Sequence, residues 1–260
     1  MNVDLKKALA AAETAARAAG QLMRQNLRRP KKVNATTSHD IKLDLDVRCQ
    51  KLIETKLRRA FPKISLLGEE GDSGATNEAR RWVVDPIDGT VNFAYGIPHA
   101  CVSIALQQRT TQSTYATIVG VIYDPFTDEI WTATQSSPAR LNGRVIHVSA
   151  RKQLSECIVC VGFAKSRHSL QRALPHFVWM ARRVRKMRMM GAAALGLAYV
   201  ASGRFDAYLE RGVSLWDVAA GGLIVERAGG KFWTEAIPGR HQIRMVASNG
   251  LIHSQLPLPK

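Results

Sequence analysis

Two aspartates in the stretch RWVVDPIDGTVNF have the type and the spacing to bind a cation. Asp85 and Asp88 stand three residues apart at the end of a short apolar run, and a hard cation between them would relieve their repulsion. A turn between them would free the carbonyl of Ile87 as a further oxygen ligand for Mg²⁺. Gly89 would let a phosphate approach the backbone, and Thr90 would add a hydroxyl and the amides of a helix start. The stretch therefore indicates a metal and phosphate site, with an ordinary surface turn as the alternative.

Further acids stand in comparable settings elsewhere in the chain. Glu69 and Glu70 follow a short apolar run, and ligands bind at strand ends in α/β sheets. Asp46 and Asp217 lie at the predicted starts of helices, where capping of the helix is the alternative explanation. Glu210 follows an apolar run, where a surface position at a strand end is the alternative.

The spacing of apolar residues outlines the elements that must position these acids. A helical period predicts helices over residues 3–27, 44–60 and 217–228. Shorter apolar runs, bounded by turn residues, predict strands over residues 64–67, 82–84, 100–107, 116–123 and 129–133. Strands and helices alternate again over 157–233, which favours a mixed α/β or α+β fold.

A weak boundary between two halves is predicted around residues 138–150, near Asn142-Gly143. It divides the chain into a first half, 1–145, which carries most of the acidic motifs, and a second half, 146–260, which completes the site. The boundary does not have the composition of a flexible linker, so we expect the two halves to pack tightly as one functional unit.

The 260-residue chain is strongly basic, with a formal net charge of +16 and a pI near 10.2. Lys and Arg gather over residues 24–32 and 151–188. Such a surface suits anionic partners such as phosphorylated metabolites or nucleic acid, although a solvated face is the simpler explanation and no RNA-binding motif with interleaved aromatics is present. No apolar run is long enough to span a membrane, so we expect a soluble, cytoplasmic protein with no membrane partner.

Four cysteines are few for this length, which is typical of a reducing compartment. Cys157 and Cys160 have the spacing of a CxxC motif. They lie in an apolar run without a second pair of ligands, so two buried thiols are favoured over a redox or zinc site.

Taken together, the motifs resemble the inositol monophosphatase-like, Mg²⁺-dependent, lithium-sensitive phosphatases. Two stretches carry most of the resemblance, DPIDGTVNF over 85–93 and WDVAAGG over 216–222. The sequences GEE, GAAA and AYLE, over 68–70, 191–194 and 207–210, stand at the spacing of the family. The resemblance covers nearly the whole chain. It implies a layered αβαβα sandwich of the inositol monophosphatase/fructose-1,6-bisphosphatase type, often dimeric.

The resemblance also implies a set of metal ligands. Glu69, Asp85 and the carbonyl of Ile87 would bind a first Mg²⁺, and Asp85, Asp88 and Asp217 would bind a second. Glu69 could also share a third, weaker ion. Two ions about 4 Å apart can neutralise both the attacking and the leaving oxygen of a phosphate ester, so no nucleophilic side chain is required.

The other matching positions surround the substrate. Asp46 and Thr90, together with Glu70, would orient and activate the attacking water. Contacts with the substrate are implied for the amides of Gly89 and Thr90 on the phosphate, and for Glu210 and the backbone near Ala192 and Ala193 on the hydroxyls.

The chain departs from the family at two positions. Ala35 stands where many members carry a lysine, about eleven residues before the acid that matches Asp46. Lys31, Lys32 or Lys42 are candidates to replace it. The segment after GEE also lacks the Ser or Thr found in the family.

The expected function is Mg²⁺-dependent hydrolysis of a small phosphate monoester by water attacking in line. Inositol 1-phosphate is the default substrate by resemblance, and 3′-phosphoadenosine 5′-phosphate, fructose 1,6-bisphosphate and histidinol phosphate are the alternatives. A binding role in an RNA or transcription complex, using the basic surface, is the hypothesis from a different class.

Overall fold

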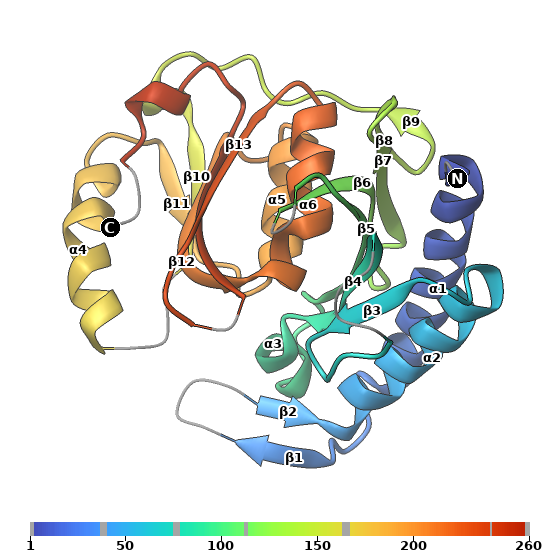
Figure 1. The fold of residues 1–260 in the computed structure, drawn as a ribbon. Coiled ribbons are helices and arrows are strands. Elements are labelled where there is room, and N and C mark those ends of the chain that lie inside the picture. The colour runs from blue at the N-terminus through green and yellow to red at the C-terminus, as the bar shows by residue number, and fades with distance from the viewer. Residues whose placement is uncertain are drawn as a thin grey trace.

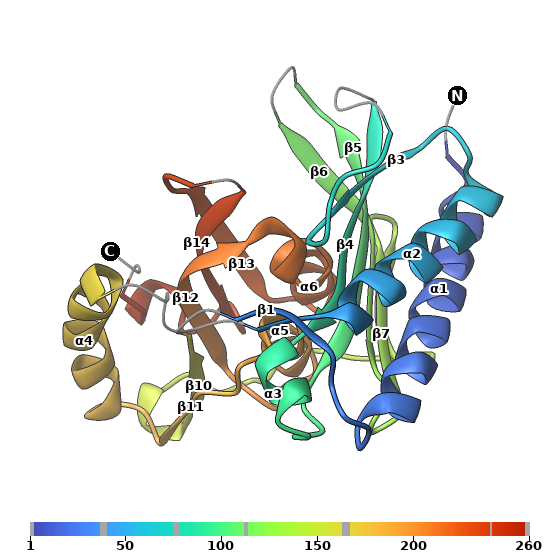
Figure 2. The ribbon, with the colours of Figure 1, turned by 90° about the horizontal axis from the view of Figure 1, so that it is seen from below.

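The computed structural model describes residues 3–36, 41–74, 79–111, 114–162, 167–239 and 241–257. Over these ranges the chain forms five layers in the order αβαβα (Figures 1 and 2). The layered fold expected from the sequence is confirmed.

The outer layer on one side consists of helices α1 (Leu5–Asn26) and α2 (Asp44–Ala60), which lie against each other. The buried face of α1 consists mainly of alanines, so the helix axis can approach the sheet closely. At Gly20 a Cβ atom would come within 2.5 Å of the ring of Tyr123 on the sheet, so a larger residue would push the helix outward.

The second layer is a seven-stranded sheet in the order β3-β4-β5-β6-β7-β8-β9. Only β3 and β4 are parallel to each other, and every other neighbouring pair is antiparallel. The strands are β3 (Ser65–Gly68), β4 (Arg80–Asp88), β5 (Cys101–Arg109), β6 (Tyr115–Asp124), β7 (Glu129–Thr134), β8 (Ser137–Leu141) and β9 (Arg144–Val145).

The middle layer consists of helices α5 (Ala193–Ala201) and α6 (Leu215–Arg227), which lie between the two sheets (Figure 1). Both helices contact strands of both sheets, and one hydrophobic cluster runs through all three layers. At Gly120 of β6 a Cβ atom would come within 2.7 Å of the carbonyl oxygen of Ala220, so α6 packs directly on the backbone of the seven-stranded sheet.

The fourth layer is a five-stranded sheet in the order β11-β10-β12-β14-β13, with helix α4 (Arg167–Ala181) on its outer face (Figure 2). Its strands are β10 (Ile158–Val161), β11 (Lys186–Arg188), β12 (Ala207–Ser214), β13 (Lys231–Ala236) and β14 (Gln242–Ser248). The remaining elements are the ribbon of β1 (Val33–Thr36) and β2 (Ile41–Leu43), the short helix α3 (Thr90–Ala94), and two 3₁₀ turns, η1 (Leu154–Glu156) and η2 (His253–Gln255).

The structure confirms the predicted helices and the five predicted strands to within a few residues, except for the strand that leads into the acidic motif. The prediction ended that strand at Val84, whereas β4 runs from Arg80 to Asp88 and includes both aspartates. The difference arises because the extra residue between the aspartates is accommodated by a bulge, and pairing with β5 resumes at Asp88.

Two smaller expectations can also be checked. Cys157 and Cys160 are both free and buried at β10, which confirms the buried thiols. Among the described residues, no helix combines the length and the apolar character needed to cross a bilayer.

Candidate active site

A bulge in β4 brings the two aspartates of the central motif to one face of the sheet. Asp85 pairs with Ser103 of β5, whereas Asp88 pairs with Cys101, so β4 contains one residue more than its partner over this stretch. In a regular strand two residues three apart point to opposite faces. Because Ser103 and Cys101 share a face, the extra residue places Asp85 and Asp88 on the same face as each other.

The carboxyl group of Asp88 is held by the start of helix α5. Its two oxygens accept hydrogen bonds from the amides of Ala193 at 3.0 Å and Ala194 at 2.7 Å. The thiol of Cys101 lies 3.6 Å from one of the same oxygens. Asp88 therefore connects the seven-stranded sheet to the middle layer, and a helix start stabilises the negative charge.

The backbone that follows Asp85 forms a compact turn. The amide of Ile87 donates to Asp85 Oδ1 at 3.0 Å, and the hydroxyl of Thr90 donates to the carbonyl of Ile87 at 2.9 Å. Gly89 has a φ of 91° and precedes the first residue of α3. A Cβ atom at Gly89 would come within 2.9 Å of the carbonyl oxygen of His99, so this turn requires glycine.

Asp46 and Asp217 are each the third residue of a helix, α2 and α6 respectively. The carboxyl group of each caps the N-terminus of its own helix. Asp46 Oδ2 accepts from the amide of Leu43 and Asp217 Oδ2 accepts from the amide of Ser214, each at 2.7 Å. The capping explanation is therefore correct for one oxygen of each carboxyl group. Asp46 Oδ1 is buried and has no hydrogen-bond partner in the described structure. Capping thus holds this side chain in place while leaving an oxygen for another ligand.

Glu69 and Glu70 lie on the turn after β3, beside the start of α2. Lys42 of the ribbon places its ammonium group 3.4 Å from Glu70 Oε1. Lys42 also pairs with Ala35 in the backbone register, so a cation does lie across the ribbon from the position where the family carries its lysine. Lys31 is engaged elsewhere, because its ammonium group donates to three carbonyls at the end of α1.

The electrostatics show that these acids form one group in space. Burial is the main cause that raises the pKa of Asp85, and the charges of Glu69, Asp88, Asp217 and Asp46 raise it further. Burial likewise raises the pKa of Asp88 to about 7, although its hydrogen bonds to α5 oppose the shift. Five buried or half-buried carboxyl groups from four segments of the chain therefore interact in one region, and we call them the acidic group: Asp46, Glu69, Asp85, Asp88 and Asp217.

Burial also raises the pKa of Asp46 to about 8. The charges of Glu69 and Glu70 act in the same direction, and the amide of Leu43 and the charge of Lys42 oppose it. In the metal-free protein this acid therefore binds a proton near neutral pH.

The donor set fits a hard divalent cation in its chemistry. It consists of carboxylate and carbonyl oxygens with one buried oxygen unpartnered, and their mutual repulsion is what a cation would relieve. Within the described ranges, however, no three His, Cys, Asp or Glu side chains are gathered closely enough to hold an ion as they stand.

The residues expected to face the hydroxyls of the substrate lie on the second half of the chain. Glu210 of β12 accepts a hydrogen bond from the hydroxyl of Tyr208. A Cβ atom at Gly162 would come within 1.8 Å of Glu210, so the absence of a side chain there makes room for the carboxyl group. The amide of Ala193 donates to Asp88, so a substrate contact at Ala193 would require Asp88 to move, and such contacts at Ala192 and Ala193 stay a prediction.

Two side-chain amides that hold this site together were not predicted from the sequence. Asn92 donates to the carbonyl of His99 at 2.9 Å and to the carbonyl of Met190 at 2.8 Å, and so joins α3 to the loop before α5. Gln50 of α2 contacts the turn that carries Glu69 and Glu70. The asparagine stood within the motif, but nothing in the local sequence indicated either bond.

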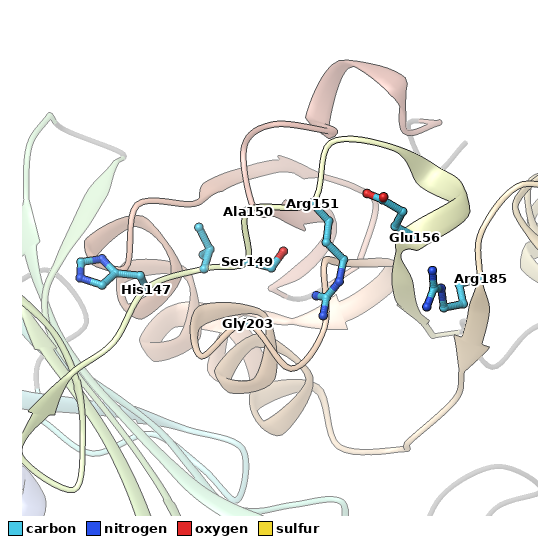
Figure 3. Close-up of a pocket in the computed structure, with 8 residues that line it drawn as sticks. His147, Ser149, Ala150, Arg151, Glu156, Arg185 and Gly203 are labelled. Atoms are coloured by element: carbon cyan, nitrogen blue, oxygen red, sulfur yellow. The ribbon is translucent and has the colours of Figure 1, made fainter.

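A separate pocket of about 600 Å³ lies where the chain passes between the two sheets (Figure 3). Arg151 and Arg185 line it, but Glu156 also lines it, and Arg151 pairs with the buried Asp206 at 3.0 Å. The two positive charges of Arg151 and Arg185 are balanced by the negative charges of Glu156 and Asp206. None of the residues that line this pocket belongs to the acidic group.

Other basic residues of this half lie on the surface. They comprise Arg182, Arg183, Arg185, Lys186 and Arg188, all of which are exposed.

Comparison with known proteins links this geometry to one family. The model of the inositol monophosphatase family matches residues 4–254. An inositol-1-monophosphatase of Rhizobium meliloti is 38% identical over 235 residues, covering 88% of this chain and 83% of that protein. A Xylella fastidiosa protein named Nus factor SuhB is 39% identical over 219 residues, covering 83% and 78%.

Solved structures agree with these matches. The inositol monophosphatase of Anabaena is 34% identical with a TM-score of 0.83 and covers 98% of each chain. The extragenic suppressor protein suhB of Bartonella henselae is 33% identical with a TM-score of 0.85 and covers 95% of each chain.

Proposed function

Because the chain belongs to the inositol monophosphatase family of phosphoric monoester hydrolases, we propose that it hydrolyses a small phosphate monoester at the acidic group, with Mg²⁺ as the cofactor. The observation that carries this proposal is the mutual interaction of five buried or half-buried carboxyl groups around Asp85. Such a group is costly in the folded protein unless cations bind there.

The metal ligands would be Glu69, Asp85, Asp88 and Asp217, with the carbonyl of Ile87 as the neutral donor. We expect two ions, with a third, weaker ion shared by Glu69. When bound, Mg²⁺ would neutralise charge on the phosphate oxygens and lower the pKa of water.

The other residues would act on the water and the phosphate. Asp46 has one buried oxygen without a hydrogen-bond partner and would accept a proton from the attacking water. Thr90, together with Glu70, would orient that water. The amides of Gly89 and Thr90 would bind the phosphate.

The substrate proposed is inositol 1-phosphate, with Glu210 and the backbone at Ala192 and Ala193 facing its hydroxyls. The names of the relatives support this choice, since inositol-1-monophosphatases of two bacteria and plant inositol monophosphatases are among them. The alternatives stay 3′-phosphoadenosine 5′-phosphate, fructose 1,6-bisphosphate and histidinol phosphate. We further propose lithium sensitivity, a homodimer, a cytoplasmic location, and halves divided near residue 145 that act as one unit.

A second candidate function is binding within a transcription complex. Two observations favour it: relatives from three bacterial species carry the name Nus factor SuhB, and exposed basic residues gather around β11. Binding of RNA through this surface would weaken steeply with salt and would not depend on Asp88.

The test is phosphate release from the four candidate substrates, with Mg²⁺ and with EDTA. Asp88→Asn is the variant, and Asp124→Asn is the matched control because Asp124 is a buried acid outside the acidic group. We expect metal-dependent turnover that Asp88→Asn lowers by a factor of a hundred or more and that Asp124→Asn retains. Normal turnover in folded Asp88→Asn would refute the metal assignment.

A further inference from the structure

The side chain of Gln50 on helix α2 makes two hydrogen bonds to the turn that carries Glu69 and Glu70, and we call this pair of bonds the Gln50 clamp. The amide of Glu70 donates to Gln50 Oε1 at 3.0 Å, and Gln50 Nε2 donates to the carbonyl of Gly71 at 2.8 Å. Gln50 is 7% exposed. A carboxamide offers an acceptor and a donor at once, so this one side chain can pair both polar groups at the tip of the turn.

Besides Gln50, the turn is held by backbone bonds at its base and by the ion pair of Glu70 with the half-exposed Lys42. Its base is anchored, because the amide of Glu69 donates to Val84 and because Leu66 and Ser73 pair in both directions. Across its tip the only backbone bond among the described residues is the long one, 3.3 Å, from the amide of Gly71 to Gly68. The two bonds to Gln50 are shorter, at 2.8 and 3.0 Å, and are partly buried.

The contact between the turn and Gln50 is also close in shape. A Cβ atom at Gly68 would come within 2.3 Å of Gln50 Oε1, so the turn lies directly against the amide. Gln50 follows Asp46 by four residues, which places both side chains on the same face of α2. One face of α2 therefore carries Asp46 into the site. Through Gln50, the same face also holds the turn that carries Glu69 and Glu70.

The electrostatics explain why a clamp is needed. The negative charges of Glu69 and Glu70 act on the carboxyl group of Asp46, and the charge of Glu69 also acts on those of Asp85 and Asp88. These acids therefore repel one another. Without an opposing constraint, the turn would relax away from the remaining carboxyl groups.

We propose that Gln50 is a positioning residue for the metal site: it holds the turn at 68–71 so that Glu69 and Glu70 face the other acids before a cation binds. This inference rests on the proposed function for the identity of the cation, but the clamp itself is a property of the protein alone. Loss of the clamp should weaken metal binding more than it slows the reaction once metal is bound.

The experiment compares the wild type with Gln50→Leu, which keeps the approximate size and removes both hydrogen bonds, and with Gln50→Glu, which keeps the acceptor for the amide of Glu70. Ile53→Val is the matched control, because Ile53 is buried on the same helix and does not bond the turn. Mn²⁺ binding to metal-free protein is measured by calorimetry, and hydrogen exchange is followed in a peptide covering the turn.

We expect Gln50→Leu to raise the Kd for Mn²⁺ roughly 10- to 100-fold, because two hydrogen bonds are lost. Turnover at saturating Mg²⁺ should recover to within about threefold of the wild type, and the turn should exchange faster without metal. The Kd and the exchange rate of Gln50→Glu should lie between those of the wild type and Gln50→Leu. Ile53→Val should match the wild type in both.

Unchanged Mn²⁺ affinity and unchanged hydrogen exchange in Gln50→Leu would overturn the proposal. A loss of Mn²⁺ affinity in Ile53→Val as large as that in Gln50→Leu would overturn it too. If Gln50→Leu did not fold, an unaltered Kd and exchange in Gln50→Glu would overturn it instead. A wild type that bound no Mn²⁺ would refute the proposed function, whereas the exchange of the turn would still decide whether Gln50 holds it.

Discussion

The raised pKa of Asp46 makes the stability of the metal-free protein depend on pH in a direction that can be worked out. In the folded protein this pKa is about 8, whereas an unfolded chain has an ordinary Asp near 4. Between these values the folded state holds a proton that the unfolded state has released. The free energy of unfolding therefore falls as pH rises, by about 1.4 kcal/mol per pH unit for this one group.

Asp46→Asn isolates this contribution. The asparagine oxygen can still accept the hydrogen bond from the amide of Leu43, but the side chain no longer titrates. From about pH 5.5 to about pH 7.5, the stability of the variant should gain roughly 2–3 kcal/mol relative to the wild type. Asp46 is only 2% exposed, so solvent screening reduces this figure little.

The assay is denaturant unfolding in EDTA at a series of pH values, with Asp44→Asn as the control. Asp44 lies on the same helix turn, but its side chain is 39% exposed. The control should follow the wild type at every pH. Excess Mg²⁺ should stabilise the wild type most at high pH, where the carboxyl groups are charged. Parallel curves for Asp46→Asn and the wild type in EDTA would refute the reasoning.

Two further substitutions probe other contacts of the site. Asn92→Leu leaves the carbonyls of His99 and Met190 unpaired, so we expect a loss of about 2 kcal/mol in unfolding free energy and a fall in melting temperature of roughly 4–8 °C. A thermal melt indistinguishable from the wild type would contradict this. Gly162→Ala places a methyl group on the carboxyl group of Glu210, so KM for the substrate should rise about tenfold or more while metal affinity stays unchanged. Steady-state kinetics would measure the KM, and a Mn²⁺ titration would measure the metal affinity. An unaltered KM would show that Glu210 does not contact the substrate.

The acidic residues could be predicted from the sequence because their types and spacing are local. Asp85 and Asp88 stand in one short motif, and the layered fold follows from a resemblance that the family comparison confirms. The bulge that turns both carboxyl groups to one face depends on how β4 registers with β5. No local pattern fixes that register, so the strand was predicted to end too early.

The side-chain amides of Gln50 and Asn92 show more clearly that a local sequence pattern does not predict contacts between distant segments. Gln50 bonds a residue 21 positions away, and Asn92 bonds one 98 positions away. Such bonds form only after distant segments have packed. At Asp46, in contrast, the sequence offered capping and catalysis as alternatives, and the structure shows that capping uses only one of the two oxygens.

The position of α5 between two sheets also determines how freely its sequence can change. Eight of the nine residues of α5 are buried, whereas only seven of the 22 residues of the outer helix α1 are. An outer helix has a solvent face on which substitutions cost little, but α5 has neighbours on nearly every side. A library of random point variants should therefore survive selection along most of α1 and fail along nearly all of α5, including positions far from any acid.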